Sequence, residues 1–194
     1  IKKKLSDKNK KINFFKKGYI NIISVGRLTD QKDHLTSLKA IKFLNPNLKI
    51  KMIIMGKGEN KLLLENYIKV NKLNHKIKLI GYKKNPYPYL KKANIVLLSS
   101  KYEGLPNILL EAQFLKKYII STNCPTGPKE ILLNGKAGDL VKMGDYKKIA
   151  HLISIYKKEK SKINKKINIG YNNFSRFDYE LNCKKYLNFV KKNI

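Results

Sequence analysis

The amino-acid sequence predicts an α/β fold built on a doubly wound parallel sheet, that is, a Rossmann-like domain. Short apolar runs rich in Ile, Val and Leu alternate with longer amphipathic runs along most of the chain. This alternation is typical of strands joined by crossover helices, which make neighbouring strands parallel. The run 95–98 is apolar at every position, as expected for a strand that is buried on both faces of a sheet.

The other elements follow the same rhythm along the chain. Asp33 and Asp145 each precede an apolar helical pattern, and aspartate is a favoured N-cap because its carboxylate accepts early backbone N–H groups. Strands are expected at residues 19–25, 49–55, 76–80, 95–98, 118–122 and 138–142. Helices are expected at residues 34–44, 61–70, 107–117, 129–133 and 146–157, with a short helical turn ending at 92 and a basic helical segment at the end.

The turn that joins strand 95–98 to helix 107–117 contains an acid, a glycine and a proline. Pro106 suits the first helical position, where its missing N–H group costs nothing. The N–H groups of Asn107 and Ile108 would then point at the carboxyl edge of the sheet, where open α/β sheets bind anions. The turn therefore predicts an anion site.

Two acids flank this predicted anion site. Glu103 lies in the turn and Glu111 lies eight positions later in the helix, so one carboxylate is expected at the mouth of a cleft and the other further along it. Ionised carboxylates only accept hydrogen bonds, and sugar hydroxyls can donate them. The alternative, an ordinary loop acid and a solvated helix residue, is disfavoured by the segment Gly104–Asn107 between them.

The loop after the first strand adds positive charge to the same edge of the sheet. Gly26 allows the backbone to approach a ligand, Arg27 offers a two-pronged donor for phosphate oxygens, and Lys32 adds a second cation. Two cations beside a helix N-terminus suit a diphosphate and would stabilise it as a leaving group. Arg27 is one of only two arginines in the chain, whereas Lys32 could also be an ordinary surface lysine.

Two further loops carry weaker signals. Gly56 and Gly58 follow the second strand, but the third glycine of a dinucleotide fingerprint is absent. Gly81-Tyr82 follows the third strand and is equally compatible with an ordinary turn at the end of a strand. These residues become informative only together with the stronger motifs above.

The spacing Glu-x7-Glu at 103–111, together with Gly26-Arg27-Leu28 and Gln31-Lys32, resembles the retaining glycosyltransferases of the GT-B fold, family 4 (group 1), whose relatives include glycogen and sucrose synthases. The resemblance covers residues 18–192. It implies the C-terminal, nucleotide-sugar-binding half of such an enzyme, acting on a nucleotide-diphosphate sugar, expected to be a UDP-sugar, without a metal or another cofactor.

The resemblance also implies a role for each candidate residue. Arg27 and Lys32 would stabilise the departing diphosphate, Glu103 would bind the donor sugar, and Glu111 would bind the ribose. Backbone N–H groups for phosphate or sugar would come from Leu105, Asn107 and Ile108, whereas Pro106 has no N–H to offer. The complete expected substrate-binding set is Gly26, Arg27, Lys32, Gly56, Gly58, Tyr82, Glu103, Gly104, Leu105, Pro106, Asn107, Ile108 and Glu111.

The charge of the chain bears on its partners. The 43 basic and 13 acidic residues give a net charge of +30, nearly all of it from lysine. Nucleic-acid readers rely on arginine, so a specific nucleic-acid partner is disfavoured, and a basic nucleic-acid-binding domain is kept only as an alternative. Lysine near an anionic membrane surface contributes on the order of 1 kcal/mol per residue, which favours peripheral attachment. A non-catalytic nucleotide-binding regulator of the same fold is the other alternative.

Localisation and domain organisation are expected as follows. Cys124 and Cys183 form no disulfide framework, the three histidines are unclustered, and no apolar run approaches the roughly 18 residues of a membrane helix, so a cytoplasmic protein without a metal site is expected. Residues 1–18 are expected to be a linker, 19–170 the donor-binding domain and 171–194 a helix that crosses back to an acceptor domain. That domain, expected to precede this chain, would bind a glycan or lipid-linked acceptor, so little transfer is expected from the chain alone.

Overall fold

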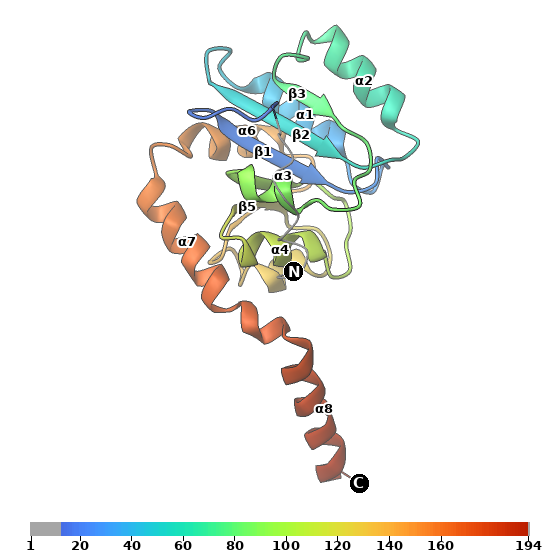
Figure 1. The fold of residues 1–194 in the computed structure, drawn as a ribbon, viewed down its shortest axis with the longest axis vertical. Coiled ribbons are helices and arrows are strands. Elements are labelled where there is room, and N and C mark those ends of the chain that lie inside the picture. The colour runs from blue at the N-terminus through green and yellow to red at the C-terminus, as the bar shows by residue number, and fades with distance from the viewer. Residues whose placement is uncertain (1–12, 194) are drawn as a thin grey trace.

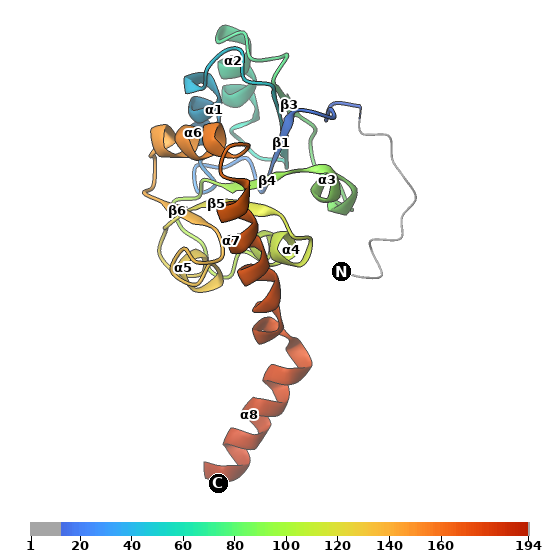
Figure 2. The ribbon, with the colours of Figure 1, turned by 90° about the vertical axis from the view of Figure 1, so that its left-hand side faces the viewer.

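The computed structural model describes residues 13–193, and within them a six-stranded parallel sheet lies between two layers of helices (Figures 1 and 2). The strands are β1 Ile20–Val25, β2 Ile50–Met55, β3 Ile77–Leu79, β4 Ile95–Leu98, β5 Tyr118–Thr122 and β6 Asp139–Val141. The helices are α1 His34–Phe43, α2 Lys61–Val70, α3 Tyr87–Lys92, α4 Asn107–Phe114, α5 Pro128–Ile131, α6 Tyr146–Ile155, α7 Lys160–Asn172 and α8 Tyr179–Asn193, with a 3-10 turn, η2, at Phe174–Phe177.

The strand order is β3-β2-β1-β4-β5-β6, with every neighbouring pair parallel. The chain builds outward from β1 to β3, returns through α3, and then builds outward in the opposite direction from β4. Ile22 of β1 pairs with Ile95 of β4 at the centre of the sheet. Connections leave these two strands in opposite directions, which opens a crevice beyond their carboxyl ends. The doubly wound α/β fold predicted from the sequence is confirmed.

Side chains alternate between the two faces of the sheet, as the pleat of a strand requires. Ile22 and Ile54 pack in one core with α1, α2 and α6, whereas Ile23 and Ile53 pack in a second core with α3, α4 and α5 (Figure 2). Both faces of the central strands are therefore covered, which explains why these strands are apolar at nearly every position.

Helix α4 begins at the predicted residue, Asn107, but Pro106 has a different position from the one predicted and the helix ends earlier. Pro106 is the N-cap, with φ −71° and ψ 92°, and so lies one position before the helix instead of at its first position. The helix ends at Phe114 because Lys116 adopts a left-handed φ of 51° and the Lys117 N–H bonds to the Ala112 carbonyl at 2.9 Å. These two features form a Schellman motif, in which lysine occupies the position usually taken by glycine.

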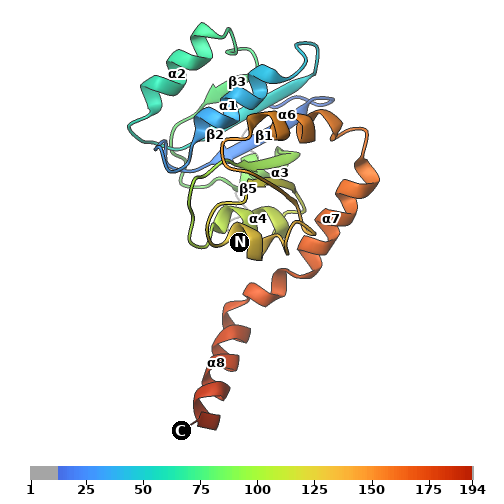
Figure 3. The same ribbon diagram turned by 180° about the vertical axis from the view of Figure 1, so that it is seen from behind.

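The C-terminal segment leaves the domain. Helix α7 begins at the first core, where Ile163 is buried, and reaches α4, where Gly170 lies against Gln113. Phe174 then contacts Phe114 with a ring separation of 5.6 Å. Helix α8 buries no residue and extends away from the sheet in all three views (Figures 1, 2 and 3).

The expected linker and the ends of the chain are described only in part. Residues 1–12 of that linker lie outside the described residues, and Phe15 is buried against the second core. No helix between residues 13 and 193 combines the length and the apolar character needed to cross a membrane. The expected domain boundaries stay predictions.

Candidate functional site

The loops that follow β1 and β4 are tied together at the carboxyl edge of the sheet. The Lys101 N–H group donates to the Gln31 carbonyl at 2.8 Å, and the Ser99 hydroxyl donates to the Lys32 carbonyl at 3.0 Å. Ser99 is buried and also accepts a hydrogen bond from the Ser37 hydroxyl of α1 at 2.9 Å. The crevice at the centre of the sheet is thus bordered by two loops with a fixed mutual position.

An ion pair joins these two loops at the carboxyl edge of the sheet. The Lys32 ammonium lies 2.5 Å from Glu103 Oε1, and the two side chains are only 17% and 7% exposed. The Ser100 hydroxyl, which is fully buried, donates to the same carboxylate oxygen at 2.6 Å. Removing either partner would leave the other charge buried and uncompensated. The acid and the cation therefore stabilise each other in adjacent positions.

Arg27 is connected to the same pair of loops through Gln31. Arg27 Nη2 donates to Gln31 Oε1 at 3.2 Å, and Gln31 Nε2 donates to the Tyr102 carbonyl at 3.0 Å. The Arg27 side chain is otherwise exposed at the edge of the crevice. The structure therefore brings Arg27, Lys32 and Glu103 together, and Gln31, which sequence reasoning did not select as a site residue, is the group that links them.

His34 makes a hydrogen bond to the backbone of the loop that follows β1. Its Nε2 lies 3.1 Å from the Arg27 carbonyl, which can only accept, so Nε2 carries the proton and Nδ1 accepts from the Ser24 hydroxyl at 3.2 Å. Burial, with a smaller contribution from the nearby Lys32 charge, lowers the pKa of His34 from 6.5 to about 4. The neutral imidazole thereby fixes the turn that carries Arg27. The sequence showed His34 only as an isolated histidine.

Helix α4 presents its N-terminus to the same edge. It has no side-chain cap, so its first N–H groups are not satisfied by a local side chain and carry the positive end of the helix dipole. Leu105 is 53% exposed beside it, and Asn107 is exposed at its first position. The start of α4 thus has the uncapped N-terminus that the predicted anion site requires, and the anion site itself stays a prediction.

Glu111 lies on α4 and is held by a group from another helix. The Tyr87 hydroxyl of α3 donates to Glu111 Oε1 at 2.9 Å, and Tyr87 is only 5% exposed. Burial and the Glu111 carboxylate together raise the pKa of Tyr87 to about 12. Glu111 is thus oriented within the helix layer, and no sequence motif indicated that Tyr87 would be its partner.

The glycines of the second loop make room for the first loop. A Cβ atom at Gly56 would lie 1.8 Å from the Gly26 carbonyl oxygen, and one at Gly58 would lie 2.3 Å from the Leu28 carbonyl oxygen. Tyr82 lies beyond β3 at the same edge and is 62% exposed. Because Gly56 and Gly58 have no side chains, the loop that carries Arg27 can pack directly against the loop that follows β2.

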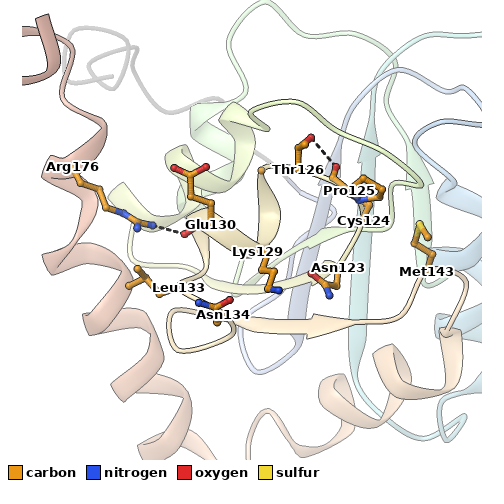
Figure 4. A pocket seen from close by; sticks show the side chains of 11 residues that line it. Asn123, Cys124, Pro125, Thr126, Lys129, Glu130, Leu133, Asn134, Met143 and Arg176 are labelled. Carbon is orange, nitrogen blue, oxygen red and sulfur yellow. Dashed lines mark hydrogen bonds between the residues drawn. The ribbon is translucent and has the colours of Figure 1, made fainter. Parts of the chain in front are cut away.

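A pocket of about 740 Å³ lies beside the crevice, at the carboxyl ends of β5 and β6 (Figure 4). Its wall includes Thr126, whose hydroxyl donates to the Glu103 carbonyl, so a hydrogen bond ties the pocket wall to the turn that carries Glu103. Arg176 reaches this wall from η2 and donates to the carbonyls of Glu130 and Ile131 at 2.7 and 2.9 Å. The second arginine of the chain thus holds the end of α5.

Side chains that could hold a metal do not gather in the described part of the chain. Across residues 13–193, no three His, Cys, Asp or Glu side chains lie close enough together to form a metal site.

The family model for glycosyl transferases group 1 matches residues 6–174. The chain belongs to this family. Its sheet and helices match those of GT-B glycosyltransferases, as the sequence predicted.

Two curated group 1 relatives show how much of a complete protein this chain represents. It is 42% identical over 123 residues to an uncharacterized glycosyltransferase of Methanocaldococcus jannaschii, a match that covers 62% of this chain and 30% of that protein. It is 33% identical over 122 residues to the N-acetylgalactosamine-N,N'-diacetylbacillosaminyl-diphospho-undecaprenol 4-alpha-N-acetylgalactosaminyltransferase of Campylobacter jejuni, covering 63% of this chain and 33% of that protein. The match thus spans about a third of each of these relatives.

Solved structures of low sequence identity share the fold. Alr3699/HepE of Anabaena, crystallised with UDP, matches with a TM-score of 0.80 and 15% identity, covering 91% of this chain and 49% of that one. A glycosyltransferase of Rickettsia africae matches with a TM-score of 0.81 and 20% identity, covering 91% and 48%. This group 1 chain therefore has the fold of about half of each of these proteins.

Proposed function

We propose that this chain is the donor-binding part of a retaining glycosyltransferase, which transfers a sugar from a UDP-sugar to a glycan or lipid-linked acceptor. The observation that carries the proposal is the contact of 2.5 Å between Lys32 and Glu103 across the central crevice, beside the uncapped N-terminus of α4. A cation for phosphate and an acid for hydroxyls are the two groups that a sugar diphosphate requires.

The diphosphate would lie between the first loop and α4. Arg27 and Lys32 supply positive charge from one side, and the first N–H groups of α4 supply it from the other. As the bond between the sugar and the diphosphate breaks, negative charge builds up on the departing phosphate oxygen. Groups already aimed at that oxygen stabilise the transition state more than the ground state, and they do so in this account without a metal ion.

The two glutamates would bind the hydroxyls on either side of the diphosphate. Glu111 lies four residues after Asn107, or about 6 Å along the helix axis at the rise of an α-helix. That span suits the ribose of a nucleotide whose phosphates contact the start of α4. Glu103, at the turn before the helix, then faces the donor sugar, and the acceptor attacks the sugar on the face that the diphosphate leaves, which retains the configuration.

The choice of UDP and of the acceptor class draws on the relatives. The Anabaena neighbour was crystallised with UDP, and the name of the Campylobacter relative describes transfer onto a diphospho-undecaprenol carrier. A lipid-linked acceptor would bring the enzyme to a membrane, where its net charge of +30 favours anionic headgroups. The free cysteines Cys124 and Cys183 fit the reducing cytoplasmic side.

The acceptor is proposed to bind a domain that lies outside this chain. Helix α8 fits this arrangement, because Tyr186 and Leu187 are 69% and 56% exposed and need another surface to cover them. Residues 171–194 would then cross back to that domain.

A transfer assay on the full-length protein tests this function. With UDP-sugars as donors, Glu103→Gln should lower kcat by about 100-fold, because the neutral amide loses the strongest acceptor for the donor hydroxyls. Glu65→Gln, at a half-exposed acid on α2, should leave kcat unchanged. Analysis of the anomeric configuration of the product by NMR should show retention. Full activity of Glu103→Gln, or an inverted product, would contradict the proposal.

A further inference from the structure

Tyr87 lies in the core, but its hydroxyl makes a hydrogen bond to a charged side chain, that of Glu111. Tyr87 packs among the residues of the second core, and its hydroxyl donates to Glu111 Oε1 at 2.9 Å. The two residues are 24 positions apart, on α3 and α4. The contact therefore joins α3, which lies in the connection from β3 to β4, to α4, which begins at the crevice.

The backbone around Tyr87 is unusually restricted. Pro86 and Pro88 flank it, and the proline ring restricts φ at both positions, with a φ of −82° at Pro86. The Tyr87 N–H group donates to the Asn85 side chain at 3.1 Å, which closes a short turn before α3. The backbone that carries the ring is thus restrained on both sides of Tyr87.

The Tyr87 contact is compatible with Glu111 accepting from more than one donor. An ionised carboxylate has two oxygens with about four acceptor positions in all, and the Tyr87 hydroxyl donates to one of these oxygens, Oε1. A neutral hydroxyl orients the carboxylate and leaves its negative charge in place. A lysine ammonium at the same position would neutralise that charge. The pKa of Tyr87, raised to about 12, keeps that hydroxyl protonated across the pH range in which proteins work.

We propose that Tyr87 is a positioning residue that orients the Glu111 carboxylate toward the two adjacent ribose hydroxyls of the bound nucleotide. This inference rests on the proposed function, in which Glu111 accepts from the ribose. Its physical basis is that two adjacent hydroxyls can both donate to one carboxylate only when its plane has the correct rotation. A merely structural tie between α3 and α4 would instead affect every ligand of the site equally.

A pair of nucleotides separates these two roles. Calorimetric titration of Tyr87→Phe should show an affinity for UDP about tenfold weaker than that of the unmodified chain, the usual size of a lost hydrogen bond to a charged group. The affinity for 2′,3′-dideoxy-UDP, which lacks both hydroxyls, should be unchanged. Tyr89→Phe is the matched control, because Tyr89 lies half-buried in the same helix and layer, and it should bind both nucleotides normally.

A second variant checks the route of the effect. In a Glu111→Gln background, Tyr87→Phe should cost no further affinity for UDP, since the carboxylate that it orients is gone. Equal weakening toward UDP and its dideoxy form, or unchanged UDP affinity in Tyr87→Phe, would overturn the inference while leaving the proposed function intact. Failure of the unmodified chain to bind UDP would instead overturn the proposed function itself.

Discussion

His34 connects strand β1 to the loop that carries Arg27. Its imidazole lies between the Ser24 hydroxyl and the Arg27 carbonyl, and both contacts require the neutral ring in a single tautomer. Because burial lowers its pKa to about 4, protonation at mildly acidic pH is resisted in the folded state but not in the unfolded chain.

This difference predicts a specific pH dependence of stability. Above pH ~6.5 the ring is neutral in both states and its contribution is complete. As the pH falls from there toward about 4, the unfolded chain takes up a proton that the folded chain does not, so the free energy of unfolding falls by at most ~1.4 kcal/mol per pH unit. Urea unfolding of His34→Gln should show a smaller decrease than the unmodified chain over this range.

The exposed histidine at position 75 provides the control. His75→Gln should keep the pH dependence of the unmodified chain, because that side chain is solvated in both states. Parallel curves for the unmodified chain and His34→Gln would show that His34 is not held neutral.

At the scale of residues, the charged residues of the site were predictable from the sequence, whereas the residues that hold their side chains in place were not. Arg27 and Glu103 stood out because arginine is rare in this chain and because an acid beside an anion site is unusual. Tyr87 belongs to no motif, and Gln31 entered the sequence analysis only beside Lys32, without a role of its own. The partner of Tyr87 lies 24 positions away and that of Gln31 lies 71 positions away, so only the fold brings these groups into contact.

At the scale of elements, the loop after β1 rests directly on the loop after β2. The Leu28 N–H group donates to the Lys57 carbonyl at 2.8 Å, and the Asn60 N–H group donates to the Leu28 carbonyl at 2.9 Å. This spacing leaves no room for a side chain at Gly56, whose Cβ would overlap the Gly26 carbonyl. The position of Arg27 thus depends on a residue in another loop.

Gly56→Ala should therefore weaken both the fold and the site. The clash is with backbone, so the first loop must move, and the cost expected for overpacking is roughly 1–3 kcal/mol of unfolding free energy. Urea unfolding should measure that loss, and UDP affinity should fall with it. Gly104→Ala is the control for stability, because a Cβ there would have no atom within 4 Å. Equal stabilities of the two variants would contradict the account of loop packing.

The ends of the helices show what sequence patterns miss at this scale. Helix α2 was predicted at its observed bounds, Lys61–Val70, because its apolar period is clear. The end of α4 was predicted three residues too late. Its terminating residue is Lys116, in a left-handed conformation that glycine usually signals, and a lysine gives no such signal.

At the scale of the whole molecule, the sheet topology determines where the site lies. Alternating strands and helices predicted a parallel doubly wound sheet, and the structure has one. The strand order could not be derived from the alternation, since each new strand can join either edge. The direction in which new strands are added to the sheet reverses between β1 and β4. This reversal places the loops after β1 and β4 on opposite sides of one crevice, although Lys32 and Glu103 are 71 positions apart.

The measurement that tests the central claim most directly is a calorimetric titration of this chain at physiological salt. UDP, GDP, NAD and a short DNA duplex would be compared on the unmodified chain, Arg27→Ala and Glu111→Ala. We expect selective binding of UDP that is weakened at least about tenfold in both variants, since each removes a charged hydrogen-bonding partner. Binding of DNA alone, indifferent to both substitutions, would contradict the assignment of this crevice as a nucleotide-sugar site.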